Sequence, residues 1–230
     1  EESIAQFLGA EAATLFGSGY LANLGLLAAL AVDGGVVYSD ELNHASIVDG
    51  CRLCRTRVEI YRHRDVDHLR GMLAAGAAEK EPRIVITESI FSMDGDEAPL
   101  VAICDAAADA GAWVLVDEAH AFGVAGPGGR GLAHDLACEG RIHARMGTLG
   151  KAAGAYGAFV AGSAALAEYL RNRARPYMYS TALPPGVASA ALAVVGIITG
   201  EEGERRRGRL AEICVALRAA LAAGGWPSAG

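Results

Sequence analysis

Short apolar runs alternate with longer helix-like stretches along most of the chain. The clearest unit has an apolar run at 83–90, a helix that opens on Pro99 and ends at Gly111, and a second apolar run at 113–117. A crossover of this length makes its two strands parallel and right-handed. The pattern therefore predicts an α/β fold built on a mostly parallel sheet.

The same alternation extends on both sides of this unit. Strands are expected at 36–38, 58–61, 142–148 and 156–161, and helices at 1–8, 21–31, 47–55, 67–75 and 163–171. The segment 175–185, with several hydroxyl groups in a row, is expected to be extended. Residues 187–223 are expected to be mostly helical, with a break at the glycines near 200–203.

Composition narrows the classes of function. At 230 residues and 52% hydrophobic, the chain can bury a sizeable core, but no apolar run is long enough to span a bilayer, so we expect no membrane partner. A formal net charge of -7 argues against a nucleic-acid partner held by phosphate contacts. The cysteines are odd in number, so we expect free thiols in a cytoplasmic protein. Cys51 and Cys54 are the only close pair, which does not indicate zinc without a second pair.

A single lysine, Lys151, lies in the glycine-rich stretch 145–154, just past a strand-like run. The chain has only one other lysine, Lys80 in a charged run, beside eighteen arginines. Lysine, unlike arginine, can lose its proton when it is desolvated, and a neutral amine can form a Schiff base with an aldehyde or ketone. A lysine that ends a strand and extends to water fits the stretch equally well. A P-loop does not fit, because Arg145 and Ala152 stand where that motif needs Gly and Ser or Thr.

Polar residues also lie where predicted strands end. Ser92, Asp117 and His120 all follow apolar runs, and open α/β sheets bind ligands along the carboxyl edge of their strands. Because Asp117 follows four apolar residues, it should be buried and should need a partner, either a protonated ring nitrogen or a structural arginine. His44 lies at a strand-to-helix junction, where a lone histidine is more often a helix cap or a surface residue.

Two glycine-rich segments were weighed as phosphate sites. The turn at 17–20 leads into a helix whose N–H groups and dipole suit a phosphate, although an ordinary loop with a serine cap explains it as well. The segment 126–131 matches G-x-G-x-x-G, but Pro127 interrupts it and no strand-to-helix turn surrounds it, so we interpret it as a loop. A lysine in a glycine loop, a strand-end aspartate, a histidine three residues later and a glycine turn at a helix start together match what pyridoxal phosphate requires.

Six stretches of the sequence, which include these residues, together resemble one protein family. They are LFGSGYLAN (15–23), ELNHASIVDG (41–50), TESIFSMDGDEAPL (87–100), VDEAHAFGVAGPGGRG (116–131), GTLGKAAGAYGAFV (147–160) and RNRARPYMYSTALPP (171–185). In this order they resemble the α-oxoamine synthases, pyridoxal-phosphate enzymes of fold type I. The resemblance implies an aspartate-aminotransferase-like large domain, a mostly parallel sheet flanked by helices. Within the family, the chain is most similar to enzymes of biotin biosynthesis that condense L-alanine with pimeloyl-CoA or pimeloyl-carrier protein, releasing CO2 and giving 8-amino-7-oxononanoate.

The resemblance implies a role for each matched residue. Lys151 would form the Schiff base and move the α-proton, Asp117 would hold the pyridinium nitrogen, and His44 would stack on the ring. His120 would bond the phenolic oxygen and is a candidate to polarise the thioester carbonyl. The other implied cofactor contacts are Ser92, Gly19, Tyr20, Thr148 and, across a homodimer interface, Ser180 and Thr181, while Asn23 and Glu88 match positions near the substrates.

The resemblance also implies a domain division. Residues 1–185 are expected to form the cofactor-binding large domain, and 186–230 a long connecting helix and the start of a truncated C-terminal small domain. Family members have further segments at both ends, including an arginine that grips the amino-acid carboxylate, and no arginine here matches it. We therefore expect a polypeptide of these 230 residues to be inactive by itself.

Other functions remain as alternatives. Close relatives are glycine C-acetyltransferases and serine palmitoyltransferases, and a more distant alternative is an aminotransferase. A non-catalytic partner subunit would lack the Schiff-base lysine, so the presence of Lys151 argues against it. A nucleotide-binding module built on 126–131 is the weakest alternative and predicts NAD binding.

Overall fold

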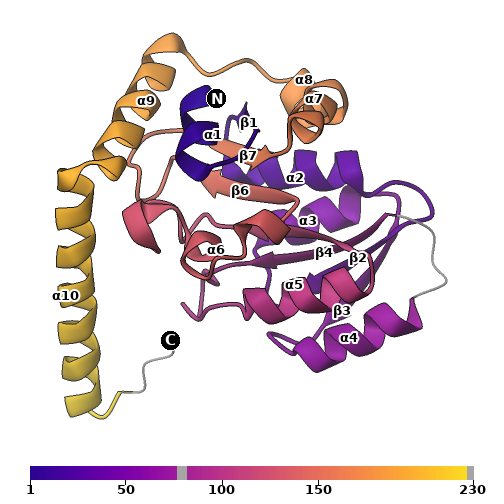
Figure 1. Ribbon diagram of the computed structural model, residues 1–230, viewed down its shortest axis with the longest axis horizontal. Coiled ribbons are helices and arrows are strands. Elements are labelled where there is room, and N and C mark those ends of the chain that lie inside the picture. Colours follow the sequence, from indigo (N-terminus) through magenta and orange to yellow (C-terminus); the bar gives the residue numbers. More distant parts are fainter. Residues whose placement is uncertain (77–81, 227–230) are drawn as a thin grey trace.

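The computed structural model describes residues 1–76 and 82–226, so Lys80 lies outside the described residues. These residues form a single seven-stranded sheet with helices on both faces (Figure 1). The strands, in their order across the sheet, are β1 (Ala12–Phe16), β7 (Ala158–Gly162), β6 (Ala144–Thr148), β5 (Trp113–Asp117), β4 (Arg83–Glu88), β2 (Val36–Asp40) and β3 (Arg57–Tyr61). The predicted α/β class is therefore confirmed.

Strand direction follows the predicted crossover. The five strands from β6 to β3 run parallel, including the pair β4 and β5 on which the prediction rested. β7 is antiparallel to β6, and β1 is antiparallel to β7. The parallel strands thus end at one edge, where their carboxyl ends and the following loops meet.

Alternate residues of each central strand enter opposite halves of the core. In β5, Val114 and Val116 pack on one face, while Leu115 packs on the other. The first face is covered by α4 (Val66–Ala75) and α5 (Leu100–Asp109), and the second by α2 (Gly19–Leu30), α3 (Ala45–Leu53) and α7 (Ala164–Arg173). Because both faces are buried, the strands are continuous apolar runs.

A third cluster covers the antiparallel end of the sheet. Phe159 and Ala161 of β7 pack there with α1 (Glu2–Leu8) and with α9 (Pro185–Thr199), while their neighbours Ala158 and Val160 face α2. The short α6 (Leu132–Asp135) and two 3-10 turns, η1 (Pro127–Gly129) and η2 (Glu139–Arg141), lie between β5 and β6. The glycine segment 126–131 therefore forms a loop with a 3-10 turn, as interpreted from the sequence.

The prediction of an extended segment at 175–185 is wrong in its first part. Residues Arg175–Met178 form a short helix, α8, in which the N–H groups of Tyr177 and Met178 donate to the carbonyl of Ala174. Pro176 suits the first turn of a helix, because its missing N–H would have no partner there.

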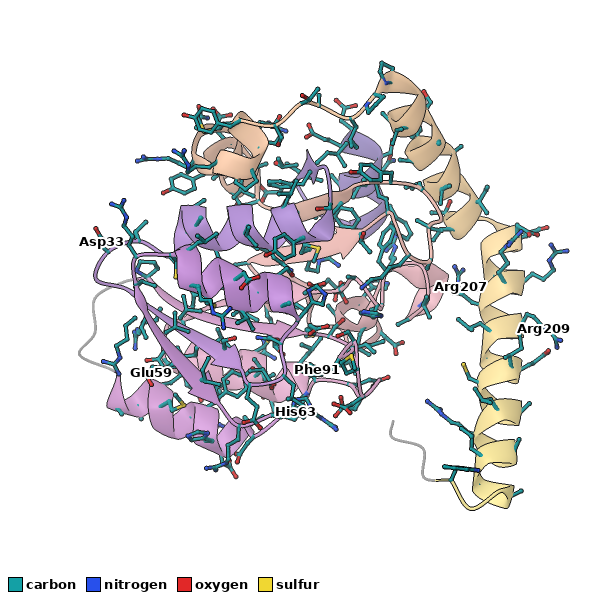
Figure 2. The ribbon with its side chains drawn as sticks, turned by 180° about the vertical axis from the view of Figure 1, so that it is seen from behind. Asp33, Glu59, His63, Phe91, Arg207 and Arg209 are labelled. Atoms are coloured by element: carbon teal, nitrogen blue, oxygen red, sulfur yellow. The ribbon has the colours of Figure 1, made fainter. Side chains whose placement is uncertain are left out.

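The helical segment near the end breaks where the glycines predicted it. α9 and α10 (Glu201–Ala223) are bent by 70° at Gly200, and Gly203 allows them to approach closely, since a Cβ there would lie 2.3 Å from the carbonyl oxygen of Ile198. α10 extends away from the body (Figure 1). Its Arg207 faces the body and its Arg209 faces away (Figure 2).

Among the described helices, none taken singly combines the length and the apolar composition needed to cross a membrane. Only the bent pair of α9 and α10 meets both conditions, by length and composition, when the two helices are counted together.

Candidate functional site

The predicted functional residues converge at the carboxyl edge of the sheet. Glu88 and Asp117 end β4 and β5 and are register partners, while Thr148 ends the adjacent β6. The turns that follow β5 and β6 bring two more groups together, because Lys151 Nζ lies 2.6 Å from His120 Nε2. The structure thus places an amine, an imidazole and two carboxyl groups on three neighbouring strand ends.

Asp117 is a buried carboxylate with neutral hydrogen-bond donors only. Its Oδ1 accepts from the N–H of Ala119 at 2.8 Å, and its Oδ2 accepts from Asn23 Nδ2 at 2.8 Å. It forms no ion pair within residues 1–76 and 82–226, and burial raises its pKa. The structural-arginine alternative is therefore excluded among the described residues, and a cationic N–H donor would match this carboxylate.

A polar chain joins Asp117 to His44. Asn23 Nδ2 also donates to Ser46 Oγ at 2.9 Å, and Ser46 Oγ lies 2.8 Å from His44 Nδ1. Because His44 Nδ1 accepts the backbone N–H of Ser46 as the N-cap of α3, its lone pair is engaged and the proton of a neutral ring belongs on Nε2. His44 is thus both the helix cap and part of the site.

Glu88 forms hydrogen bonds with the loop between β2 and α3, which carries Asn43 and His44. Its Oε1 accepts the backbone N–H of His44 at 2.6 Å, and its own N–H donates to Asn43 Oδ1 at 3.1 Å. Burial, followed by the charge of Asp117, raises the pKa of Glu88 to about 7. A carboxyl group with this pKa changes protonation near neutral pH, which suits proton transfer.

Lys151 and His120 are both shifted toward their neutral forms. Burial lowers the pKa of the Lys151 amine, although the charges of Asp117 and Glu88 oppose this effect. Burial, followed by the charge of Lys151, lowers the pKa of His120. A lysine that loses its proton readily is the form that attacks a carbonyl.

A candidate anion site lies beside β6. Ser18 caps α2 by accepting the N–H of Leu21 at 3.2 Å, so Gly19 and Tyr20 come before the first bonded amide of the helix. A Cβ on Gly19 would lie 3.9 Å from Thr148 Cβ, which places the start of α2 against the end of β6. The serine cap is present, and the N–H groups that precede the first bonded amide of the helix would suit a phosphate.

Three predicted residues lie outside this cluster or at its margin. Ser92 lies in the turn after β4, and its backbone N–H approaches Glu88. Ser180 and Thr181 are exposed in the connection between α8 and α9, where they line a groove with 15–17. The single chain does not bring these two hydroxyls to Lys151.

Sequence reasoning missed two residues of the site, Asn43 and Ser46. Asn43 donates to Ser39 Oγ and to the carbonyl of Ile86, so it joins β2 and β4, and Ser46 connects His44 to Asn23. Both look like ordinary cap residues in the sequence. Their spacing around His44 is the only local signal, and their contacts with Asn23, Ile86 and Glu88 join residues 23 or more positions apart.

The edge as a whole matches one kind of ligand. Asp117 suits a cationic ring N–H, the start of α2 suits a phosphate, and Lys151 suits a carbonyl carbon. Among the described residues, no group of three His, Cys, Asp or Glu side chains is arranged to hold a metal ion.

Sequence comparison places the chain in a family. The family of aminotransferase class I and II matches residues 1–230. Among curated relatives, the 8-amino-7-oxononanoate synthase of Anaeromyxobacter dehalogenans (strain 2CP-C) is 51% identical over 96% of this chain and 55% of its own length. The synthase of that name from Geobacter sulfurreducens is 47% identical over the whole chain and 59% of its length. The chain thus spans somewhat over half the length of these relatives.

Solved structures agree with this assignment. Serine palmitoyltransferase from S. paucimobilis, determined with a bound PLP-myriocin aldimine, matches with a TM-score of 0.92 and 35% identity over 99% of this chain and 56% of that chain. The 8-amino-7-oxononanoate synthase of Francisella tularensis matches with a TM-score of 0.85 and 30% identity over all of this chain and 66% of that one. These matches confirm fold type I and the resemblance to the α-oxoamine synthases. The chain belongs to the aminotransferase class I and II family.

Proposed function

We propose that this chain carries the pyridoxal-phosphate site of an acyltransferase. The reaction condenses L-alanine with pimeloyl-CoA or a pimeloyl-carrier protein and gives 8-amino-7-oxononanoate, free CoA or carrier thiol, and CO2. The observation that carries the proposal is the 2.6 Å contact of Lys151 Nζ with His120 Nε2 beside the buried Asp117, which forms no ion pair among the described residues. The curated relatives of this name, at 51% and 47% identity, support the substrates.

The residues present fit the cofactor. Asp117 has no cationic partner among the described residues, and the nearby Asn23 Oδ1 is buried without a hydrogen bond. A pyridinium N–H offers the cationic donor that this carboxylate needs. Gly19, Tyr20 and Thr148 would hold the phosphate, and Lys151 would hold the carbonyl carbon. When bound, the cofactor supplies an electron sink for the charge left at the amino acid's α-carbon.

The chain's own groups then move protons and orient substrates. Lys151 Nζ, once freed by the amino acid, takes the α-proton, because its lowered pKa makes a neutral amine accessible. His120 is a neutral donor and acceptor at 2.6 Å, and it holds this amine and polarises the thioester carbonyl. His44 would pack on the ring of the cofactor, and Ser92 would bond to it. Glu88 and Asn23 set the position of His44 through the contacts described above.

A shared site explains the two hydroxyls that do not reach Lys151. We propose that Ser180 and Thr181, which are exposed beside α8, bind the phosphate in the neighbouring subunit of a homodimer. We also propose that 1–185 is the cofactor-binding domain and that 186–230 leads into a second, smaller domain. α10 supports this division, since most of its length stands clear of the body (Figure 1).

The main alternatives use the same site with other substrates. Serine palmitoyltransferase is favoured by its TM-score of 0.92, and a glycine C-acetyltransferase would need the same cofactor contacts. The higher sequence identity to the synthases that act in biotin formation favours L-alanine and pimeloyl thioester.

Two measurements test the proposal. The protein is incubated with pyridoxal phosphate, reduced with borohydride and digested, and mass spectrometry locates the added phosphopyridoxyl group. We expect it on Lys151. Nuclear magnetic resonance in D2O then follows loss of the α-proton of L-alanine, glycine or L-serine, with pimeloyl-, acetyl- or palmitoyl-CoA added in turn. We expect L-alanine to exchange fastest, while steady consumption of pimeloyl-CoA by this chain alone would contradict the expectation that these 230 residues are inactive by themselves.

Two variants serve as controls. Lys80→Arg removes the only other lysine and should keep the labelling, while Lys151→Arg should abolish it. Labelling elsewhere, or none in the unmodified protein, would contradict a pyridoxal-phosphate site. Faster exchange of glycine or serine, with consumption of the matching thioester, would replace the proposed substrates with those of the alternatives.

A further inference from the structure

His63 connects two loops at the carboxyl edge of the sheet. It lies two residues after β3, and its ring packs edge-on against Phe91, with ring centroids 4.4 Å apart (Figure 2). Its Nδ1 lies 2.8 Å from Oδ1 of Asp40, the last residue of β2. Its Nε2 lies 3.0 Å from Oδ2 of Asp96, in the turn after β4. One ring thus bridges the segments that follow two different strands.

Both contacts require a charged ring. A carboxylate only accepts hydrogen bonds, and a neutral imidazole has one donor, so only the imidazolium satisfies Asp40 and Asp96 together. The other charged neighbours are Arg64, which donates its N–H to Asp40 at 2.9 Å and its guanidinium to Asp96 at 2.7 Å, and Glu41, which accepts the His63 N–H at 2.8 Å. Burial lowers the pKa of His63, but the bonds to the two aspartates outweigh it and raise the pKa above the ordinary value.

Each bridged loop leads into the proposed cofactor site. The carbonyl of Asp40 accepts the N–H of Asn43 at 3.2 Å, and Asn43 adjoins His44 and bonds Glu88. On the other side, the carbonyl of Asp96 accepts the N–H of Phe91 at 3.0 Å, immediately before Ser92. A change in the distance between Asp40 and Asp96 would therefore displace both the loop that carries His44 and the loop that carries Ser92.

We propose that His63 is a positioning residue whose imidazolium sets the spacing between the loop that carries His44 and the loop that carries Ser92. The proposal rests on the proposed function, because it treats these two residues as cofactor contacts. A neutral ring must release one aspartate. The positioning is therefore complete at low pH and is lost as pH rises through the raised pKa of His63, so cofactor affinity decreases over that range.

The first test measures protonation without any cofactor. Long-range proton–nitrogen spectra of the histidine rings, with His63 assigned by its loss in His63→Gln, should show both nitrogens protonated at pH 6, below the ordinary histidine value of 6.5. The backbone amide signals of His44 and Ser92 should shift with the same midpoint as the His63 ring. A neutral His63 at pH 6, or backbone amide signals of His44 and Ser92 that do not change as His63 titrates, would overturn the proposal.

The second test measures, at each pH, the ratio of the Kd of a variant for pyridoxal phosphate to the Kd of the unmodified protein. Titration of Lys151 and of the phosphate affects both values and therefore cancels in the ratio. His63→Gln should weaken binding by about threefold to thirtyfold at pH 6.5, a typical range for residues that act without touching the ligand, and the ratio to the unmodified protein should approach one at high pH. Asp96→Asn should remove the alkaline weakening, because the amide N–H can donate to a neutral Nε2. A purely structural role would give ratios that do not change with pH.

His134→Gln is the matched control. His134 also contacts one carboxylate, Glu139 at 2.9 Å, but it bridges no loops of the site, so its affinity ratio should stay at one. If the unmodified protein binds no pyridoxal phosphate, the proposed function fails. The His63 ring and the two amides still decide the positioning role in that case, since they are measured without cofactor.

Discussion

Lys151 Nζ and His120 Nε2 are within hydrogen-bond distance, at 2.6 Å, although they come from turns after different strands. Burial and then the charge of Lys151 lower the pKa of His120, because two cations at this distance repel. Burial acts in the same direction on both, and it is the larger cause of the lowered pKa of each group. Burial thus favours a neutral amine on Lys151, while the charges of Asp117 and Glu88 oppose it.

The first prediction concerns the pH dependence of Lys151 reactivity. In Lys80→Arg, Lys151 is the only lysine, so trapping of an aldehyde by borohydride at this position can be followed against pH. We expect the labelling rate to reach half its maximum clearly below pH 10.5, the ordinary lysine value, because burial lowers the pKa. A midpoint at or above 10.5 would contradict the electrostatics of the site.

Asp117→Asn should raise the stability of the cofactor-free protein and weaken its binding of pyridoxal phosphate. Burial raises the pKa of Asp117, so its charge costs stability at neutral pH when no cation is present, and the amide should stabilise the cofactor-free protein by roughly 1–2 kcal/mol. The Asn23 amide can turn to accept from the new N–H group, because its Oδ1 is unbonded. Affinity for pyridoxal phosphate should decrease at least about 100-fold, as expected for removing one partner of a buried charge pair. Thermal unfolding and cofactor titration measure both changes.

The sequence predicted the parts of the fold that local patterns determine. The run Trp113–Asp117 became β5 without change, because a helix-ending glycine and a charged residue bound it. The run at 83–90 was two residues too long, since Ile90 pairs only with Glu97 in an isolated bridge. α8 was not predicted, because its first turn depends on hydrogen bonds to the carbonyl of Ala174, which precedes the segment 175–185.

The residues of the site also fall into those that the sequence predicted and those that it did not. Lys151, Asp117 and His120 follow strands, so the rule for parallel sheets together with the family resemblance brought them to one edge. Ser46 and Asn43 depend on partners in other strands and helices, and no local pattern marks them. The bridging role of His63 was equally invisible, since it arises from two aspartates 23 and 33 positions away.

Glu88→Gln should give a stability difference that depends on pH. The pKa of Glu88 is about 7 in the folded protein against an ordinary 4.5, so ionisation costs folded-state stability as pH rises between these values. The variant should match the unmodified protein below pH 4.5 and exceed it above pH 7, by at most about 3 kcal/mol from the size of the shift. The glutamine oxygen can still accept the His44 N–H. Urea denaturation at pH 4.5, 6 and 8 without cofactor measures the trend, and a difference that is constant with pH would rule out this titration.

Two glycine-to-alanine changes should have opposite effects. Gly147 lies in β6, and a Cβ there would be 2.3 Å from Cζ of Phe159, a ring buried between β7 and α1, so Gly147→Ala should destabilise the protein by roughly 1–3 kcal/mol. Gly208 lies inside α10, where a Cβ would meet nothing within 4 Å, so Gly208→Ala should stabilise the helix by about 1 kcal/mol. Because Gly147 adjoins Thr148, the first change should also weaken binding of inorganic phosphate at the start of α2, and the second should leave it unaltered. Denaturant midpoints and phosphate titrations of both variants test the packing of β6 against β7, and a neutral Gly147→Ala would show that the Phe159 ring can move aside.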